Sequence, residues 1–509
     1  MPRREVQSIL AVTLACVTLT GALLSACQPS TAIALPTLAE TLPAPTASRA
    51  AATPQLPAAK PTESQVATPL STPTVISEPV PEAVTTPPPT PSHTPSATPS
   101  QTPVPTWTST PLPKGAPVLI AVTPVLSDTT AVPTPVSRVA VAPGSINIVV
   151  LGSDQRPDWN DWHTDVVQIV SIQPLIPAVT ILSVPRDLYI YVPGFWMSRI
   201  NFADMYGEVY DYEGGGPALI QQTLLYNLGI PVDYYVRTDF AGFKAIVDTL
   251  GGIDIPVHCT LQDYWPYPDE NGEYQIKVLY PGIHHMDGPT ALWYARSRKT
   301  TSVFNREERQ QQVLEGIWAR ARSLDLLPRI PELWTQSQSM ITTNMDMATV
   351  LQLAEVAFRL ESQNVRLRNI GYGQVTPWTT PHGGSVFLPN WDRIEPVVSE
   401  ALAPIPEGRM WRSLHQVEIW NGTGYADWDY LAFDRLVHEG FVASVAEADR
   451  SDYTETRLID FTTATKGSAT DYLAAMFNVS PGNVIHAADP NMPVQYRIII
   501  GADYNTCRR

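Results

Sequence analysis

The stretch SINIVVLG, residues 145–152, decides the fold class of this chain, because it is almost entirely apolar and ends in glycine. Such a run is typical of a strand that is buried on both faces, and the glycine marks the entry into a loop. The elements predicted after it alternate between two types: strands at 165–172 and 178–184, helices at 217–228 and 239–250, and a strand at 253–257. This alternation predicts an α/β domain built in layers.

A second stretch, WYARSRKTTSVFNREERQQQ at residues 293–312, gathers positive charge in a chain whose formal net charge is −16. Its basic residues are Arg296, Arg298, Lys299, Arg306 and Arg309. The predicted elements are a helix at 288–297, a polar connection at 298–304 and a long helix at 305–323. Arginine binds carboxylate or phosphate oxygens two at a time, and a helix start also favours anions. The stretch therefore predicts an anion site; a solvated basic face paired with Glu307 and Glu308 is the alternative.

Composition divides the 509 residues into unequal parts. Residues 28–143 contain 26 of the 50 prolines and very few charges, so we expect a semi-stiff, disordered linker there. Residues 144–325 are predicted to form the main α/β domain, and 326–410 a connecting region of helices and loops. Residues 411–509 are predicted to form a second, small α/β domain that begins with a strand at 417–420.

The N-terminus, residues 1–27, has the pattern of an export signal: Arg3 and Arg4 precede an uncharged, mostly apolar run. It ends in Leu-Ser-Ala-Cys, which resembles the bacterial lipoprotein box with Cys27 as the lipid site. An uncleaved transmembrane helix is the alternative, because eighteen uncharged residues are just long enough to span a bilayer. Both interpretations predict a membrane-anchored chain whose folded part lies outside the cytoplasm.

Two cysteines lie in the parts predicted to fold, Cys259 and Cys507. In an oxidising compartment they could pair, and the sequence leaves this open. No Cys/His spacing indicates a zinc site. The acidic overall balance argues against a nucleic-acid partner.

Several separated motifs in the main domain occur in a characteristic order. They are Leu-Gly-Ser-Asp-Gln-Arg (151–156), His-Thr-Asp (163–165), Ser-Val-Pro-Arg-Asp (183–187), Arg-Ile-Asn (199–201), Gly-Ile-Pro-Val-Asp-Tyr-Tyr (229–235), Leu-Gly-Gly-Ile-Asp (250–254), Tyr-Ala-Arg-Ser-Arg (294–298), and Glu-Arg-Gln-Gln (308–311) after Arg306. Over about residues 145–325 they resemble the LytR-CpsA-Psr family. Residues 414–503, with Val-Glu-Ile-Trp-Asn-Gly-Thr-Gly near their start, resemble the small LytR C-terminal domain.

The resemblance implies a phosphotransferase of the bacterial envelope. Such an enzyme takes a glycopolymer from a polyprenyl pyrophosphate carrier and joins it through a phosphodiester to an acceptor hydroxyl, usually on peptidoglycan. The implied fold is a central mixed β-sheet between helices, with an apolar tunnel for the polyprenyl chain. Two other functions stay open: a protein that binds the lipid without turnover, and a pyrophosphatase that uses water as acceptor.

The resemblance also carries site residues. Arg186, Arg296, Arg298 and Arg306 match the family's pyrophosphate-binding arginines, and fixed positive charge of this kind can stabilise a leaving phosphate. Three further arginines are predicted to bind substrate: Arg156, Arg199 and Arg309. Asp154 and Asp165 match the family's metal-associated acids, and carboxylates beside phosphates favour Mg²⁺ as the cofactor.

Two positions depart from the family's pattern. The usual Asp-Phe-Gly-Arg or Asp-Phe-Asp-Arg is replaced here by Val303-Phe-Asn-Arg306, so an acid that could orient the arginines or assist the attacking hydroxyl is missing. Either activity is reduced, or another acid such as Asp187 takes its place. His163 stands where the family commonly has Arg or Lys, so its charge would depend on pH.

Overall fold

The computed structural model describes residues 132–156, 162–326, 340–464 and 467–507, together with positions 328, 330, 334 and 337. The predicted export signal and the predicted linker, apart from its last residues 132–143, lie outside the described residues. In the part of the chain that is described, no helix is both long and apolar enough to cross a membrane.

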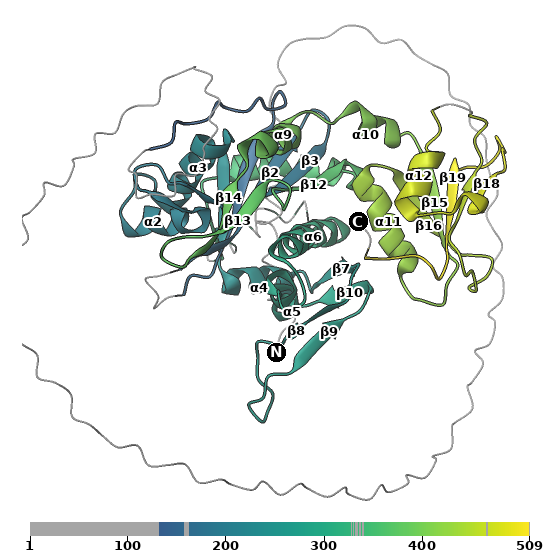
Figure 1. Ribbon diagram of the computed structural model, residues 1–509, viewed down its shortest axis with the longest axis horizontal. Coiled ribbons are helices and arrows are strands. Elements are labelled where there is room, and N and C mark those ends of the chain that lie inside the picture. Colours follow the sequence, from purple (N-terminus) through teal and green to yellow (C-terminus); the bar gives the residue numbers. More distant parts are fainter. Residues whose placement is uncertain are drawn as a thin grey trace, which may run out of the picture. The chain divides into compact units, whose positions relative to one another are not determined.

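A six-stranded mixed sheet forms the centre of the main domain (Figure 1). Its strands, in spatial order, are β11 (Ile341–Thr343), β6 (Tyr234–Thr238), β1 (Ile146–Ser153), β2 (Thr164–Gln173), β3 (Ala178–Ser183) and β12 (Val365–Asn369). The stretch SINIVVLG supplies β1, which is antiparallel to β2 and parallel to β6. The predicted α/β fold with a central mixed sheet is confirmed.

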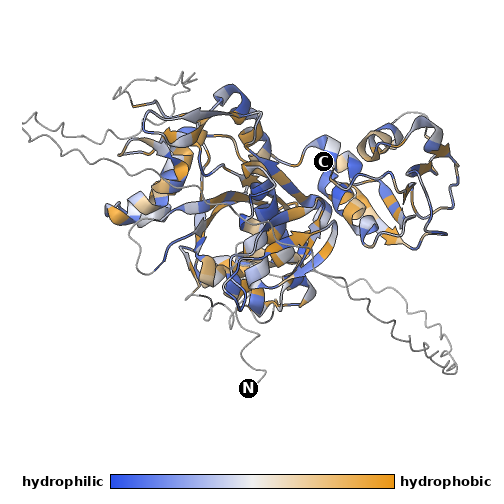
Figure 2. Cartoon of the chain, turned by 60° about the horizontal axis from the view of Figure 1, so that its bottom comes forward, coloured by the Kyte–Doolittle hydropathy of each residue, from blue (hydrophilic) through white to orange (hydrophobic). Residues whose placement is uncertain are grey.

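Helices cover both faces of this sheet because β1 is apolar on both sides. Ile148 and Val150 face a layer made by α4 (Phe240–Thr249), α5 (Gly288–Arg296), α6 (Val303–Ser323) and α8 (Met347–Arg359). Val149 and Leu151 face the opposite layer, which contains α3 (Gly215–Leu228) and α9 (Trp391–Leu402). Along both strands and helices, hydrophobic residues are interleaved with hydrophilic ones (Figure 2). Because successive side chains of a strand point to opposite faces, those of β1 belong to two separate hydrophobic clusters, one on each side of the sheet.

The predicted strand at 253–257 is confirmed as β7 (Ile253–Val257), but it pairs with β10 (Gly282–Met286) outside the central sheet. The next two strands, β8 (Leu261–Tyr264) and β9 (Ile276–Leu279), also form a separate antiparallel pair. These short ribbons follow α4 and precede α5, so they carry the chain towards the loop that holds the basic residues.

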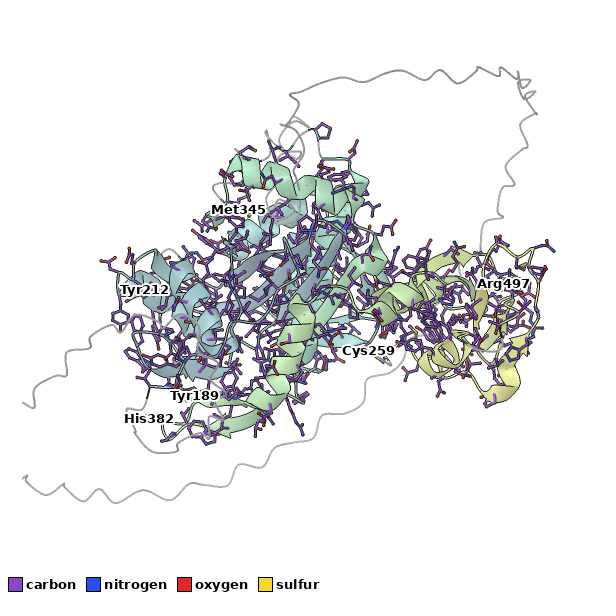
Figure 3. All side chains as sticks on the ribbon, turned by 90° about the horizontal axis from the view of Figure 1, so that it is seen from above. Tyr189, Tyr212, Cys259, Met345, His382 and Arg497 are labelled. Carbon is purple, nitrogen blue, oxygen red and sulfur yellow. A yellow bond between two sulfur atoms is a disulfide. The ribbon has the colours of Figure 1, made fainter. Side chains whose placement is uncertain are left out.

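The segment predicted as a loop at 371–392 contains a hairpin, β13 (Val375–Thr379) and β14 (Ser385–Pro389), and then the start of α9. Although the segment is rich in Gly, Pro and Trp, each strand of the hairpin has a buried residue, Val375 in β13 and Val386 in β14. Beside it lies β4 (Tyr189–Tyr191), where the Tyr189 ring is 5.8 Å from the ring of Trp378. Figure 3 labels Tyr189 of β4 and also His382, which lies in the turn between β13 and β14.

The main domain extends beyond both predicted boundaries. The strands β11 and β12 belong to the central sheet although they follow residue 325. At the other end, residues 132–143 are held by backbone hydrogen bonds, such as Val139 N to Gly229 O at 2.9 Å and Ala142 N to Leu402 O at 2.9 Å. Sheet pairing decides the C-terminal edge and hydrogen bonds outside the sheet decide the N-terminal edge; both join residues far apart in the sequence, which local composition does not show.

The small C-terminal domain has a five-stranded mixed sheet. Its strands, in spatial order, are β16 (Val442–Ala446), β15 (Gln416–Asn421), β19 (Tyr496–Ile500), β17 (Arg457–Asp460) and β18 (Val484–His486). Two helices pack on it, α11 (Trp428–Glu439) and α12 (Thr470–Phe477). The predicted strand at 417–420 is confirmed within β15, while β17, β18 and α12 were not predicted, because polar residues interrupt their apolar pattern.

A disulfide joins the two domains: Cys259, labelled in Figure 3, is bonded to Cys507, and their Cα atoms are 4.8 Å apart. Next to it His258 Nε2 lies 2.7 Å from Asp434 Oδ2 on α11. His438, one turn further along α11, lies 3.0 Å from Glu315 of α6. The pairing that the sequence left open is therefore made, beside a cluster of paired charges.

Candidate active site

A cavity of about 340 Å³ lies between the central sheet and helices α4, α5 and α6. Its apolar walls are formed by Val236, Phe240, Phe243, Ile246, Leu292, Val313, Leu314, Ile317 and Ile341. Charged residues from separate parts of the sequence complete the lining: Asp165, Arg186, Asp239, Asp263, Arg296, Arg298 and Arg306. An apolar cavity with a few convergent polar groups is the arrangement typical of a ligand site.

The four arginines matched by resemblance all line this cavity. Arg186 follows β3, Arg296 is the last residue of α5, Arg298 lies in the loop after it, and Arg306 is in the second turn of α6. The structure thus brings together residues that are up to 120 positions apart in the sequence.

Arg186 is held by acids on both sides. Its Nη1 is 2.5 Å from Asp165 Oδ1 on β2, and its Nε is 3.3 Å from Asp187 Oδ2. Burial alone would lower the pKa of Arg186, but Asp165 and Asp187 outweigh it and raise that pKa. Asp187 also pairs with Arg199 at 3.4 Å. Arg186 is therefore fixed in place and fully charged.

Arg306 is in the opposite situation. It is only 3% exposed, and its Nε and Nη2 have no hydrogen-bond partner among the described residues. Burial first, and then the nearby Arg186, lower the pKa of Arg306 to about 10. Buried donors are nearly always satisfied, so this residue of the cavity lining has hydrogen-bonding capacity that an anionic ligand could use.

The loop that carries Arg296 and Arg298 is held by hydrogen bonds with Asp263 and Arg309. Asp263 accepts from the backbone N–H of Arg298 at 2.8 Å. Arg309 is 6% exposed, and its Nε donates to the Tyr294 carbonyl at 2.9 Å while its Nη2 donates to the Ser297 carbonyl. Arg309 thus positions the loop and does not line the cavity, so its direct contact with substrate stays a prediction.

The start of α6 explains where Val303 lies. The Ser302 hydroxyl caps the helix by accepting a hydrogen bond from Asn305 N at 3.1 Å. The Asn305 side chain in turn accepts a hydrogen bond from the backbone N–H of Ser302. Val303 is therefore the first helical residue, two residues before the solvent-exposed Asn305. Helix α6 begins two residues earlier than the predicted range 305–323, because Ser302 caps it.

The other predicted site residues lie away from the cavity lining. Arg156 is exposed just before the undescribed segment 157–161, and Arg199 lies on β5 (Met197–Arg199) with its guanidinium 4.9 Å from the centre of the Phe202 ring. Asp154 follows β1, and its carboxylate accepts from His163 N at 2.6 Å. Their roles in binding stay predictions.

Of the two acids predicted to bind Mg²⁺, only Asp165 is placed where it could hold the ion in the cavity. This carboxylate lines the cavity beside the arginines, whereas Asp154 does not. Within the described ranges, no cluster of three or more His, Cys, Asp or Glu side chains could hold a metal. A single carboxylate is compatible with Mg²⁺, because this ion often takes its other ligands from substrate phosphates and water.

Sequence reasoning missed Glu307, which appeared there only as a partner for a solvated basic face. The side chain is 3% exposed, and burial is the main cause that raises the pKa of Glu307 to about 8. The available signal was its spacing: Phe304, Glu307 and Gln311 recur at helical intervals on a face that packs inside the protein.

The fold and the cavity define a class of protein: a layered α/β domain with arginines beside an apolar cavity, which suits an anion that carries an apolar chain. A family model described as the LytR_cpsA_psr family matches residues 127–390 of this chain. The match covers more than half of the 509 residues, so the chain belongs to the LytR_cpsA_psr family.

Individual relatives are distant. The polyisoprenyl-teichoic acid–peptidoglycan teichoic acid transferase TagT of Bacillus subtilis (strain 168) is 27% identical over 261 residues, covering 50% of this chain and 76% of TagT. Regulatory protein MsrR of Staphylococcus aureus (strain COL) is 29% identical over 211 residues, covering 41% of this chain and 59% of MsrR. The chain thus spans less than two thirds of MsrR.

Among solved structures, that of B. subtilis TagV matches with 26% identity and a TM-score of 0.41, covering 51% of this chain and 97% of that chain. A TM-score of this size supports no inference about the site.

Proposed function

We propose that this protein transfers a glycopolymer from a polyprenyl pyrophosphate carrier to a hydroxyl of a cell-wall acceptor, such as a peptidoglycan sugar. The observation that carries the proposal is Arg306, a buried arginine that lines a cavity with apolar walls and has two donors without a hydrogen-bond partner among the described residues. The apolar walls suit a polyprenyl chain, and the arginines suit its pyrophosphate. Membership of the LytR_cpsA_psr family and the distant likeness to TagT support the same chemistry.

In this proposal the acceptor oxygen attacks the phosphorus next to the sugar. The bond from that phosphorus to the bridging oxygen breaks, polyprenyl phosphate leaves, and the hydroxyl proton passes to a base or to water. Negative charge grows on the bridging oxygen, and Arg186, Arg296, Arg298 and Arg306 would stabilise it. Arg186 is held ready by Asp165 and Asp187, whereas Arg306 gains partners only when phosphate oxygens arrive.

Magnesium dependence is part of the proposal. Asp165 would hold the ion, and bound Mg²⁺ would neutralise phosphate charge. The remaining proposals concern the ends of the chain: an N-terminal lipid anchor at Cys27 on the outer side of the cell membrane, and a LytR C-terminal-like role for residues 411–509.

A second function, lipid binding without turnover, is favoured by Val303. This residue is the first of α6, half-buried near the arginines, and valine supplies neither a proton acceptor nor a charge. The same cavity would then retain the pyrophosphate lipid.

One assay separates these functions. The full chain in detergent micelles is incubated with Mg²⁺, a lipid-linked oligosaccharide pyrophosphate and a peptidoglycan oligomer, alongside Arg306→Ala, Val303→Asp and the matched control Arg359→Ala on the exposed side of α8. Released polyprenyl phosphate together with glycan on the acceptor, lost only in Arg306→Ala, is the expected result. Retained lipid without product in the parent, with turnover in Val303→Asp, would instead favour the binding function, and phosphate release without acceptor would favour a pyrophosphatase.

A further inference from the structure

Glu307 is a buried acid that the proposed reaction does not use. Its side chain is 3% exposed, and neither carboxylate oxygen has a hydrogen-bond partner among the described residues. It is not part of the cavity lining, although its neighbour Arg306 is. Buried carboxylates almost always receive hydrogen bonds, so the ionised form of Glu307 lacks the stabilisation that such groups normally have.

Four charged groups act on Glu307. Arg306 and Arg186 favour its ionised form, while Asp187 and Glu308 oppose it. Arg186 is already paired with Asp165 and Asp187, which leaves Arg306 as the main positive neighbour. Burial first, with Arg306 opposing it and Asp187 adding to it, raises the pKa of Glu307 to about 8.

An arriving pyrophosphate changes this balance. Its oxygens would take up the free donors of Arg306, and its negative charge would lie close to Glu307. Both effects disfavour an ionised Glu307, because the anion adds like charge and engages the arginine that had opposed the effect of burial.

We propose that Glu307, which lies next to the arginine site, takes up a proton from solution when an isoprenyl pyrophosphate binds beside Arg306. The inference rests on the proposed function, since it assumes a pyrophosphate at the four arginines. The proton that Glu307 gains on binding returns to solution when the leaving phosphate departs. Glu307 thereby offsets one of the negative charges that the pyrophosphate brings to the site.

This linkage has a defined pH signature. Below about pH 7 Glu307 already carries its proton, so binding takes up none and affinity does not depend on this residue. Between pH 7 and pH 9 the free protein loses the proton, and affinity for the anion should fall about tenfold. Glu307→Gln cannot ionise, so it should bind as tightly at pH 9 as the wild type binds at pH 7.

The test uses isothermal titration calorimetry of the full chain in detergent micelles with farnesyl pyrophosphate as the probe. At pH 8.5 the enthalpy is measured in two buffers with different heats of ionisation, which gives the number of protons taken up. The wild type should take up between about one half and one proton more than Glu307→Gln. Glu308→Gln, on the next residue of α6, is the matched control and should retain the uptake.

The outcomes separate the two proposals. Binding that requires Arg306 but shows equal proton uptake in wild type and Glu307→Gln overturns the role of Glu307. Failure of the wild type to bind farnesyl pyrophosphate, or equal binding by Arg306→Ala, overturns the proposed function itself. If Glu307→Gln does not fold, the wild type alone decides: no proton uptake at pH 8.5 contradicts the inference.

Discussion

Charged groups lie close together at the arginine site, where they are buried, and at the domain junction, where they are partly buried, but they are paired differently. At the site, Arg306 and Glu307 are adjacent and buried, and both have polar atoms without a partner among the described residues. At the junction, Asp434 of α11 is paired with His258 at 2.7 Å and with His438 at 3.4 Å.

The difference separates binding from structure. Removing charges from water costs free energy, and paired charges recover part of this cost within the protein. At the junction the ion pairs already recover part of this free energy within the protein, so they stabilise the contact between the two domains. The arginine site does not recover it in this way, so its unsatisfied groups can be stabilised by a ligand, at the expense of the stability of the empty protein.

The largest expected effect is at Arg306. Arg306→Met should lower glycopolymer transfer about 10²–10³-fold, because it removes donors aimed at the leaving phosphate. The same substitution should leave the melting temperature unchanged or raise it, since it removes a buried charge without breaking a pair. Activity and calorimetric unfolding measured on one preparation check both parts; a lower melting temperature would show that Arg306 is structural.

Asp434 should show the reverse behaviour. Asp434→Ala leaves His258 and His438 without their shared carboxylate, and we expect a loss of about 3 kcal/mol in the unfolding free energy of the C-terminal domain. Farnesyl pyrophosphate should bind as before, because Asp434 is not among the residues that line the cavity. Denaturant unfolding followed by tryptophan fluorescence measures the first effect, and unchanged stability would contradict the comparison.

The pH dependence of the junction follows from His438. Burial alone would lower the pKa of His438, but Asp434 and then Glu315 outweigh it and raise that pKa well above its usual range. The stabilisation is therefore fully present below about pH 6.5 and is lost as pH rises through the raised value, at up to about 1.4 kcal/mol per pH unit.

Asp434 limits the same junction on the acid side. Burial would raise the pKa of Asp434, but His438 and His258 lower it. Its stabilisation is present above about pH 4 and is lost only as pH falls through the lowered value. We therefore expect the C-terminal domain to be most stable near pH 5–6. Melting temperatures measured from pH 4 to pH 9 check this, and His438→Gln should flatten the slope above pH 7.

The smallest effect is expected at an exposed pair. Arg359 Nε lies 3.6 Å from Glu355 Oε1 on α8, with both side chains about half exposed. Arg359→Ala should change the unfolding free energy by less than about 0.5 kcal/mol, because water and salt screen the pair. A loss of unfolding free energy as large as that expected for Asp434→Ala would show that burial does not explain the difference between the exposed pair and the junction.

Much of the arginine site could be predicted from the sequence, because its groups lie in short motifs. The basic stretch at 293–312 indicated an anion site by itself, whereas Arg186 was joined to it only through the family resemblance of its motif. Glu307 could not be predicted with them. Its spacing with Phe304 and Gln311 indicates a buried helix face, but only the packing shows that its carboxylate has no partner among the described residues.

The sequence by itself determined the α/β class and indicated an anion site in the basic stretch 293–312, because strand periodicity, helix caps and fixed charge are local properties of the chain. Only the tertiary structure decided that residues 132–143 and the strands β11 and β12 complete the main domain, and that Cys259 meets Cys507. It also decided which buried charges find partners. These features depend on contacts between distant segments, whose free energy comes from burial and pairing that no local pattern records.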